Sequence, residues 1–316
     1  MARILVTGAT GFIGAHVFRT LAAAGEQPIA ATRVPAPGLA VEQRVTGDLA
    51  DLPHLGNALA GIDAVVHLAG RAHVMRDTAD DPEQAFYRAN AAATAHLARA
   101  AAAGGVQRFV FLSSIKVNGE ATLGEPFREA DAPAPQDAYG RSKWAAEQAL
   151  QALVAETDLE VVMIRPPLVY GPGVKANFLR LMRLVDRGLP LPLGAIDNRR
   201  SLVNLDNLGT LILAALHHPE AVGRTFLVSD QQDLSTPQLI RLLADALERP
   251  ARLPRVPPQL LAAMARLMLR RNAYARLASS LQVDSSLATR VLGWRPETSV
   301  IQALRTTAHW YRRIVR

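Results

Sequence analysis

The chain has 316 residues, of which 49% are hydrophobic and 20% charged, as is typical of a folded protein with a large core rather than of a disordered one. It contains no cysteine, which excludes disulfides, thiolate catalysis and cysteine-ligated metal sites, and no apolar run approaches the roughly 20 residues that would span a bilayer. The net charge of +7 is scattered without a long basic run, so an anionic small ligand explains it as well as nucleic acid does, and we expect no nucleic-acid partner.

Short β-branched runs alternate with alanine-rich stretches in the first half of the chain. The predicted elements are, in order, a strand at 3–7, a helix at 12–24, strands at 27–32 and 64–68, a helix at 91–103, a strand at 109–113, a helix at 139–156 and a strand at 160–164. This order implies parallel strands joined by right-handed crossovers, and short apolar strands fit a sheet covered on both faces. The predicted fold class is therefore α/β, with a doubly wound parallel sheet.

The second half is richer in proline and glycine, and its elements are more mixed. Its clearest predicted elements are a strand at 225–229 and helices at 237–247 and 300–313. We expect a doubly wound domain over 1–168, to which a segment near 200–230 returns. The remaining segments, 169–199 and 231–316, are predicted to form a smaller substrate-binding domain.

A glycine-rich turn follows the first strand directly and opens the first helix. Gly8 allows the tight turn, Gly11 lets the backbone approach a diphosphate, and Gly14 lets helix and strand pack closely. The helix N-terminus then directs unpaired N–H groups at the phosphates. Strand, turn and helix in this order predict a dinucleotide-binding Rossmann domain.

The end of the second strand bears on the choice of cofactor. An NAD-binding protein usually places an acid there, against the ribose 2′-hydroxyl, but this chain has Ala31-Thr32-Arg33. A carboxylate would repel a 2′-phosphate, whereas the Arg33 guanidinium can pair with one. The sequence therefore favours NADP(H), with NAD(H) as the alternative. Asp48 is predicted to contact the adenine edge; an ordinary turn acid is the other interpretation.

Tyr139 and Lys143 are four residues apart, which places both on one face of a predicted helix. An ammonium roughly 4 Å from a phenol contributes up to about 4 kcal/mol at an effective dielectric constant of 20, so we expect Lys143 to lower the pKa of Tyr139 by roughly two to three. Tyr139 could then exchange a proton with an alcohol or alkoxide. Ser114 closes a strand at the ligand-binding edge of the sheet and can hold the reacting oxygen. These residues predict an oxidoreductase acting at a secondary alcohol or ketone.

Several further motifs accompany these residues: TGATGFIG at 7–14, GDL at 47–49, VVHLAG at 65–70, Asn90 followed by Thr94, FLSS at 111–114, YGRSK at 139–143, RPPLVYGPG at 165–173 and LGW at 292–294. With them the chain resembles, over nearly its whole length, the extended short-chain dehydrogenase/reductases that act on nucleotide sugars. The resemblance implies that Ser114, Tyr139 and Lys143 are catalytic and that Asn177 and Arg200 hold the nucleotide diphosphate. It implies a cofactor-binding set of Gly8, Thr10, Gly11, Phe12, Ile13, Gly14, Arg33, Asp48, Leu49, Leu68, Ala69, Gly70, Tyr139, Lys143 and Pro166.

The same resemblance bears on the reaction. The dehydratases of the family carry an Asp-Glu pair directly after the catalytic hydroxyl residue, where this chain has Ile115 and Lys116, so dehydration is not expected. The segment 113–120, with Asn118 in place of the usual tyrosine, is similar to bacterial UDP-N-acetylquinovosamine dehydrogenases. That similarity implies NADPH-dependent C4 reduction of a UDP-4-keto-6-deoxy-N-acetylhexosamine in surface polysaccharide assembly. A UDP-hexose 4-epimerase and a non-enzymatic NADP-sensing protein are the alternatives.

The predicted sugar pocket takes its residues from several loops. Arg71 and His73, in the loop at 70–76, are predicted to line it, although a purely structural loop is an equal alternative, and Lys116 and Arg276 are added as substrate contacts. The basic stretch around Arg276 is interpreted as a packed helix with its arginines in water, the alternatives being a membrane-surface helix or a lid over the substrate. No signal peptide is evident, so we expect a cytoplasmic enzyme, and the resemblance implies a homodimer formed through the Tyr139 helix.

Overall fold

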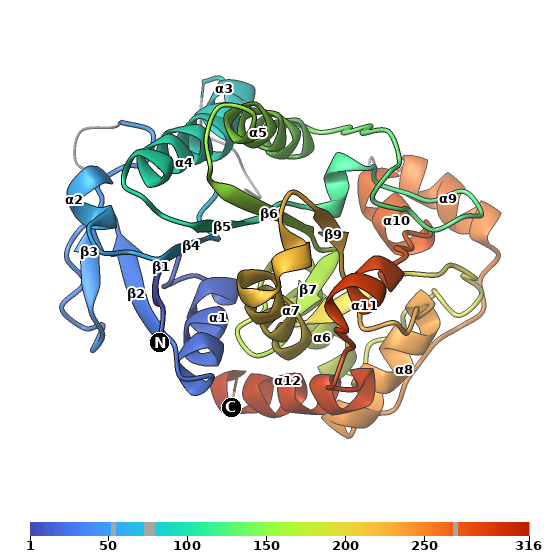
Figure 1. Ribbon diagram of the computed structural model, residues 1–316. Helices are drawn as coiled ribbons and strands as arrows, with labels where there is room; N and C mark the ends of the chain where they lie inside the picture. Colours follow the sequence, from blue (N-terminus) through green and yellow to red (C-terminus); the bar gives the residue numbers. More distant parts are fainter. Residues whose placement is uncertain (52–54, 73–79, 268–270, 316) are drawn as a thin grey trace.

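A seven-stranded parallel sheet forms the centre of the molecule in the computed structural model, which describes residues 1–51, 55–72, 80–267 and 271–315 (Figure 1). The strand order is β3-β2-β1-β4-β5-β6-β9. The strands are β1 (Arg3–Thr7), β2 (Gln27–Thr32), β3 (Gln43–Val45), β4 (Ala64–His67), β5 (Arg108–Leu112), β6 (Glu160–Arg165) and β9 (Thr225–Leu227). The predicted doubly wound α/β fold is confirmed.

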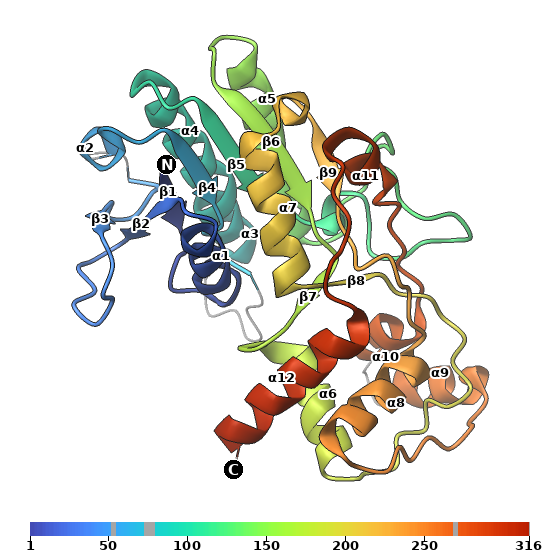
Figure 2. The same cartoon turned by 60° about the horizontal axis from the view of Figure 1, so that its bottom comes forward.

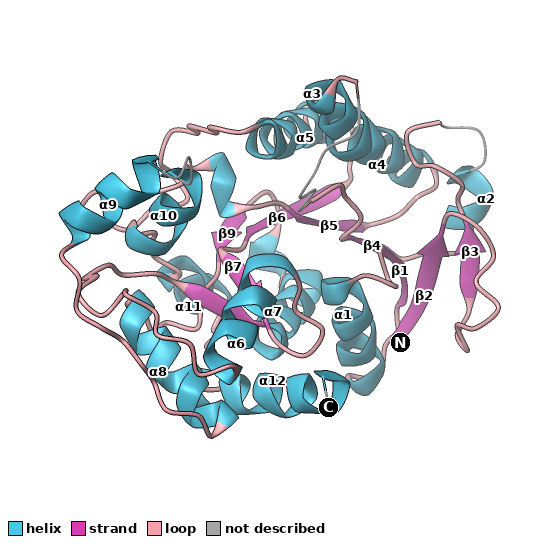
Figure 3. Ribbon diagram, turned by 180° about the vertical axis from the view of Figure 1, so that it is seen from behind, coloured by secondary structure: helices cyan, strands magenta, loops and turns pink. Residues whose placement is uncertain are grey.

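Helices cover both faces of this sheet (Figure 3). One face carries α2 (Leu55–Leu59), α3 (Pro82–Phe86), α4 (Ala93–Ala103) and α5 (Ala138–Val154), and the other carries α1 (Phe12–Ala23), α7 (Leu205–His217) and α11 (Ser286–Leu292). Successive side chains of β1 point to opposite faces of the sheet, and both faces are covered, so the three central residues are all apolar. Ile4 and Val6 enter the core under α1 and α7, while Leu5 enters the core under α4 and α5.

The order of the strands reverses between β1 and β4. In a doubly wound sheet, ligands bind at the carboxyl ends of the strands beside such a reversal. The parallel register brings those ends level: Thr7 lies opposite His67, and His67 lies opposite Phe111. Residues that follow β1, β4 and β5 therefore meet at one edge of the sheet.

A second, mainly helical portion lies beside this edge (Figure 2). It contains a two-stranded parallel sheet of β7 (Leu168–Tyr170) and β8 (Leu202–Asn204), with helices α6 (Ala176–Asp186), α8 (Thr236–Leu247), α9 (Pro258–Leu267), α10 (Arg271–Ala278) and α12 (Val300–Val315). Side chains of α6, α8 and α12 share one apolar cluster with Tyr170. Within the described ranges, no helix is long and apolar enough to cross a membrane.

The chain returns to the main sheet twice after residue 168. The first return comprises α7 and β9, near the segment expected from the sequence. The second is α11 and the turn after it, because Ala288, Leu292 and Trp294 belong to the apolar cluster beneath the main sheet. Trp294 Nε1 also donates a hydrogen bond to Thr210 Oγ1 (3.0 Å) on α7. The division into two domains stays a prediction, and α11 would add a returning segment to it.

The region before α4 differs from the predicted helix at 91–103. A π-helix spans Tyr87–Ala92, between α3 and α4, and short 3₁₀ turns span Ile115–Val117 and Pro219–Ala221. A π-helix holds one extra residue per turn, and such turns are frequent at functional sites. Here the widened turn contains Asn90, whose side chain is fully buried.

Candidate active site

The glycine turn after β1 has the shape of a phosphate cradle. Gly8 has a φ of +67°, and a Cβ at Gly14 would lie 1.9 Å from the carbonyl oxygen of Gly8. Gly11 is the N-cap of α1 and supplies no side-chain cap, and the first turn of that helix carries no acidic residue. The helix thus presents its N–H groups and positive dipole end to an anion. The turn fits the diphosphate of a dinucleotide.

The other residues of the turn contact either solvent, the main sheet or the mainly helical second portion. Thr10 and Gly11 are exposed, and Ile13 packs against the core under the main sheet. Phe12 packs against the cluster of the second portion, and its Cδ2 lies 3.3 Å from the position of a Cβ on Gly173. The turn therefore lies where the two portions meet, which suits a cofactor that has to reach a substrate.

A chain of hydrogen bonds runs from β1 through His67. Thr7 Oγ1 accepts from the N–H groups of Leu68 (3.1 Å) and Ala69 (3.0 Å) and lies 2.7 Å from His67 Nδ1. Because Thr7 has one hydroxyl proton to give, it donates to Nδ1, and His67 Nε2 carries the proton that reaches Thr94 Oγ1 (3.0 Å). Burial, together with the charge of Lys143, lowers the pKa of His67 to about 3, so the ring is neutral. The network fixes the backbone at Leu68 and Ala69, two predicted cofactor contacts.

Asn90 connects this network to the predicted catalytic helix. Its Oδ1 accepts from the N–H of Arg71 (2.7 Å), and its Nδ2 donates to the carbonyl of Arg71 (3.1 Å) and to Ser142 Oγ (2.8 Å). A Cβ on Gly70 would lie 2.9 Å from Asn90 Oδ1 and 3.4 Å from Lys143 Nζ, so a larger residue there would have to displace the Asn90 side chain. Asn90 and Thr94 belong to one of the sequence motifs, but no role was predicted for either residue. Their spacing of four on a helix was the available signal.

Ser114, Tyr139 and Lys143 converge at the end of β5. Ser114 follows this strand and is buried, and it is close enough to Tyr139 to act on the pKa of its phenol. The Tyr139 ring packs edge-on against Phe86, with centroids 6.1 Å apart. Lys143 Nζ donates to the carbonyl of Leu112 (2.9 Å) at the end of the same strand. Helix α5 brings Tyr139 and Lys143 to one side because they are one turn apart. The structure thus brings the three predicted catalytic residues together.

The predicted effect of Lys143 on Tyr139 is wrong. Burial raises the pKa of Tyr139 to about 12, the hydrogen bond from Ser114 opposes this, and the charge of Asp137 adds to it. The ammonium of Lys143 is directed at the Leu112 carbonyl and lies 4.6 Å from the centre of the Phe111 ring. Burial lowers the pKa of Lys143 itself to about 8, against the opposing charge of Glu147. In this arrangement the loss of water around Tyr139, and not the lysine charge, sets the direction of its pKa.

A buried ion pair lies directly behind the catalytic residues. Arg165 and Glu147 pair through Nε–Oε1 (2.9 Å) and Nη2–Oε2 (2.5 Å), with side chains only 5% and 0% exposed. Ser113 Oγ donates to Glu147 Oε1 (2.5 Å), and Arg165 Nη1 donates to Asn118 Oδ1 (2.8 Å). The pair therefore ties α5 to the ends of β5 and β6. The neighbouring Pro166 is buried, and its carbonyl accepts from the N–H of Ile115 (3.0 Å).

The residues predicted to select the cofactor lie beside the ends of β2 and β3. Arg33 directly follows β2 and is exposed, as a group that meets a 2′-phosphate has to be. Asp48 is also exposed, and its Oδ1 accepts from the N–H of Ala50 (3.0 Å), which is the ordinary turn role considered as its alternative. Leu49 packs against the core on the α4 and α5 face. Contacts of Arg33 and Asp48 with a cofactor stay predictions.

The predicted substrate residues are dispersed. The guanidinium carbon of Arg71 lies 5.4 Å from the centre of the Phe86 ring, and the ammonium of Lys116 pairs with Asp137 and Glu120. Asn177 is exposed in the first turn of α6; Arg200 is half-buried, donates to the carbonyl of Ser279 (3.0 Å), and has its pKa lowered by burial. His73 and the side chain of Arg276, which belongs to α10, lie outside the described residues.

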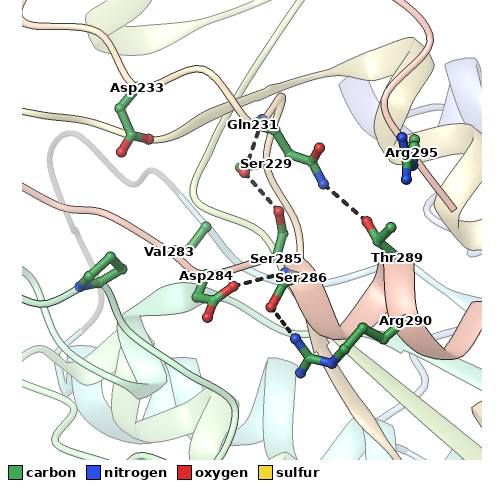
Figure 4. Close-up of a pocket in the computed structure, with 11 residues that line it drawn as sticks. Ser229, Gln231, Asp233, Val283, Asp284, Ser285, Ser286, Thr289, Arg290 and Arg295 are labelled. Atoms are coloured by element: carbon green, nitrogen blue, oxygen red, sulfur yellow. Dashed lines mark hydrogen bonds between the residues drawn. The ribbon is translucent and has the colours of Figure 1, made fainter.

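A separate pocket of about 530 Å³ opens between the end of β9 and α11 (Figure 4). None of the three predicted catalytic residues lines it. Several of its polar side chains bond to one another: Ser229 with Ser285 (3.1 Å), Gln231 with Thr289 (3.2 Å) and Arg290 with Ser286 (2.5 Å). The first two bonds join the segment after β9 to α11 and the residue before it, and the third lies within α11. The candidate active site is therefore the edge of the sheet that holds the three predicted catalytic residues.

The doubly wound sheet, the glycine cradle and the assembled Ser-Tyr-Lys set define a nicotinamide-dependent enzyme of the Rossmann type. The chain belongs to the NAD dependent epimerase/dehydratase family, which matches residues 4–229. It is 42% identical to a UDP-glucose 4-epimerase of Vibrio cholerae, with 96% of this chain and 94% of the relative covered. It is 31% identical to a GDP-6-deoxy-D-mannose reductase of Pseudomonas aeruginosa, with 99% and 98% covered. A solved structure described as MoeE5 in complex with UDP-glucose and NAD matches at a TM-score of 0.78 and 27% identity, with 99% and 100% covered.

Proposed function

We propose that the chain is a nicotinamide-dependent UDP-hexose 4-epimerase. The observation that carries this proposal is the 42% identity to a UDP-glucose 4-epimerase over 96% of the chain, together with the assembled Ser114, Tyr139 and Lys143. The matched structure of MoeE5 in complex with UDP-glucose and NAD supports the same substrate class and NAD as the cofactor. The sequence had favoured reduction with NADPH, and the similarity to the epimerase supports the alternative better.

The chain's own residues suit both halves of such a reaction. With substrate bound, Tyr139 takes the proton from the O4 hydroxyl as the C4 hydrogen leaves as hydride, and it returns that proton when hydride comes back to the other face of C4. A nicotinamide cofactor held at the cradle of Gly8, Gly11 and Gly14 would supply the hydride acceptor and donor, so no net cofactor would be consumed, and its positive charge in the oxidised form would favour the phenolate of Tyr139. Ser114 holds O4 through its hydroxyl, and Lys143 lies one turn from Tyr139 on the same side of α5.

A second candidate is the C4 reduction of a UDP-4-keto sugar. Two observations favour it: Arg33 occupies the end of β2 without an acid nearby in the strand, and Tyr139 holds its proton firmly, as an acid for a ketone must. Reduction would transfer hydride from NADPH to C4 and the Tyr139 proton to O4. It would consume one NADPH per product, which separates it from epimerisation.

The two reactions are distinguished by supplying purified protein with each set of substrates. Epimerisation predicts interconversion of UDP-glucose and UDP-galactose, or of their N-acetyl forms, by NMR with catalytic NAD⁺ and no lasting change at 340 nm. Reduction predicts loss of NADPH absorbance at 340 nm with a UDP-4-keto-6-deoxy-N-acetylhexosamine. If neither reaction occurs, both proposals are wrong and a cofactor-sensing role gains support.

Tyr139→Phe tests the chemistry itself. It should lower kcat by roughly a hundredfold or more, the usual contribution of a proton-transfer residue, with little change in cofactor binding. Tyr87→Phe is the matched control, because the Tyr87 side chain is 49% exposed and should leave kcat unchanged. Full activity of Tyr139→Phe would contradict the mechanism.

A further inference from the structure

Lys116 contacts both segments that carry the proton-transfer pair. Its ammonium forms ion pairs with Asp137 and with Glu120 (2.8 Å for the latter), and its backbone N–H donates to Ser114 Oγ (3.3 Å). Its carbonyl oxygen would lie 2.9 Å from a Cβ on Gly140, so the backbone at Lys116 packs directly against the first turn of α5. One residue thus touches the Ser114 segment and the start of the Tyr139 helix.

Through Asp137, the ion pair fixes the position of the start of α5. It is the N-cap of α5, and its Oδ1 accepts from the N–H of Gly140 (2.7 Å) while its Oδ2 pairs with Lys116. An N-cap fixes the start of a helix, and Tyr139 is only two residues further on. The position of Lys116 therefore sets where the cap, and with it the Tyr139 side chain, lies relative to Ser114.

The same contact has an electrostatic effect. Burial by itself raises the pKa of Asp137, but the hydrogen bonds from Lys116 and Gly140 bring it below its usual range, so the carboxylate is charged. That charge is one of the causes that raise the pKa of Tyr139. Lys116 is the cation that balances Asp137.

Other charged groups around Tyr139 are held by different partners. Lys143 lies one turn further along α5 and donates to a β5 carbonyl, and Arg71 packs over Phe86, the ring against which Tyr139 rests. Arg141 pairs with Glu83 on α3. Neither Glu83 nor Glu120 contributes to the pKa of Tyr139.

We infer that Lys116 is a positioning residue for the proton transfer: its ion pair with Asp137 ties the cap of the Tyr139 helix to the Ser114 segment and balances the Asp137 carboxylate two residues before Tyr139. This inference rests on the proposed function, because it assigns Lys116 a task in the same reaction. It replaces a direct substrate contact as the role of this side chain.

Two substitutions at this ion pair should shift the pH dependence of activity in opposite directions. In the epimerase direction Tyr139 must lose its proton, so kcat rises with pH through the pKa of Tyr139 in the complex. Lys116→Met leaves the Asp137 charge unbalanced and should move the midpoint upward by about half to one pH unit, which is a threefold to tenfold loss of kcat below the midpoint. Asp137→Asn keeps a good N-cap and removes the charge, so its midpoint should move downward.

Two controls separate positioning from general damage. Lys116→Arg restores the charge and should return the midpoint close to that of the unmodified protein. Glu83→Gln removes the exposed ion pair between α3 and Arg141 of α5 and should leave the midpoint unchanged. The KM for the UDP-hexose should change little in any of these variants. Midpoints that stay equal, or that shift the same way in Lys116→Met and Asp137→Asn, would overturn the inference.

A readout without turnover keeps this inference separate from the proposed function. Amide hydrogen exchange over residues 138–142 should speed up at least threefold in Lys116→Met, because the cap is loosened, and should stay unchanged in Glu83→Gln. An unmodified protein that is inactive with every UDP-hexose would refute the proposed function, while this exchange comparison would still decide the positioning role. Unchanged exchange in Lys116→Met would overturn it.

Discussion

The buried pair of Arg165 and Glu147 allows a sharp test of what holds the active site together. Arg165→Met removes three donated hydrogen bonds, two to Glu147 and one to Asn118, and leaves the fully buried Glu147 carboxylate without its counter-charge. Breaking one side of such a pair costs about 3–5 kcal/mol of unfolding free energy. Ser113 Oγ still donates to that carboxylate, but one neutral donor does not balance a buried charge.

Urea denaturation followed by circular dichroism measures this loss as a lower midpoint. Arg141→Met is the matched control: Arg141 lies on the same helix as Glu147 but pairs with Glu83 on α3, both side chains are largely exposed, and solvent screening should leave the midpoint unchanged. A double variant, Arg165→Met with Glu147→Leu, removes both charges and should recover most of the loss. Equal effects of Arg165→Met and Arg141→Met, or a double variant less stable than the single one, would refute the reasoning.

Three further outcomes follow from single side chains. Gly14→Ala should abolish cofactor binding in a fluorescence titration, because its Cβ would meet Gly8 O at 1.9 Å, whereas Gly56→Ala, with no atom within 4 Å, should bind normally. Burial lowers the pKa of His67 from 6.5 to about 3, so the neutral ring stabilises the fold fully above pH 6.5. This contribution to the free energy of unfolding is lost as the pH falls toward 3, by about 1.4 kcal/mol per pH unit. The free energy of unfolding measured from pH 7 to 4 should fall with this additional slope, and His67→Asn should lack it. Arg33→Asp should weaken NADPH binding at least tenfold and leave NADH binding unchanged, and an equal effect on both cofactors would contradict its assignment to the 2′-phosphate.

Much of the fold could be predicted because the sheet is buried on both sides. Short continuous apolar runs such as those around Val65 and Phe109 are typical of strands in a sheet that is buried on both faces, and glycines mark the first turn. Strand β3 was not predicted, because Gln43-Arg44-Val45 is short and lies at the edge of the sheet, where polar residues are tolerated. The π-helix at Tyr87–Ala92 was not predicted either, since one widened turn leaves no periodic pattern.

The candidate site was predicted in its members but not in its electrostatics. Ser114, Tyr139 and Lys143 follow from a strand end and a helical spacing, which local sequence specifies. The direction of the Tyr139 pKa depends on where the Lys143 ammonium points and on how much water burial removes, and neither is encoded locally. The partnership of Lys116 with Asp137 joins residues 21 positions apart, so only the packed structure shows it.

The widened turn at Asn90 has a consequence for how this chain tolerates insertions and deletions. In a regular helix each residue turns the following segment by about 100°, so a one-residue deletion within Tyr87–Ala92 would rotate every later side chain of α4 by that angle. Leu97 and Ala101, now fully buried, would swing away from the core, or Asn90 would leave its place beside Ser142. The extra residue changes the rotation of α4 about its axis, so that Asn90 faces the polar site at the start of the helix while the later residues face the apolar core. Homologous chains should therefore keep the length of this segment more strictly than its composition.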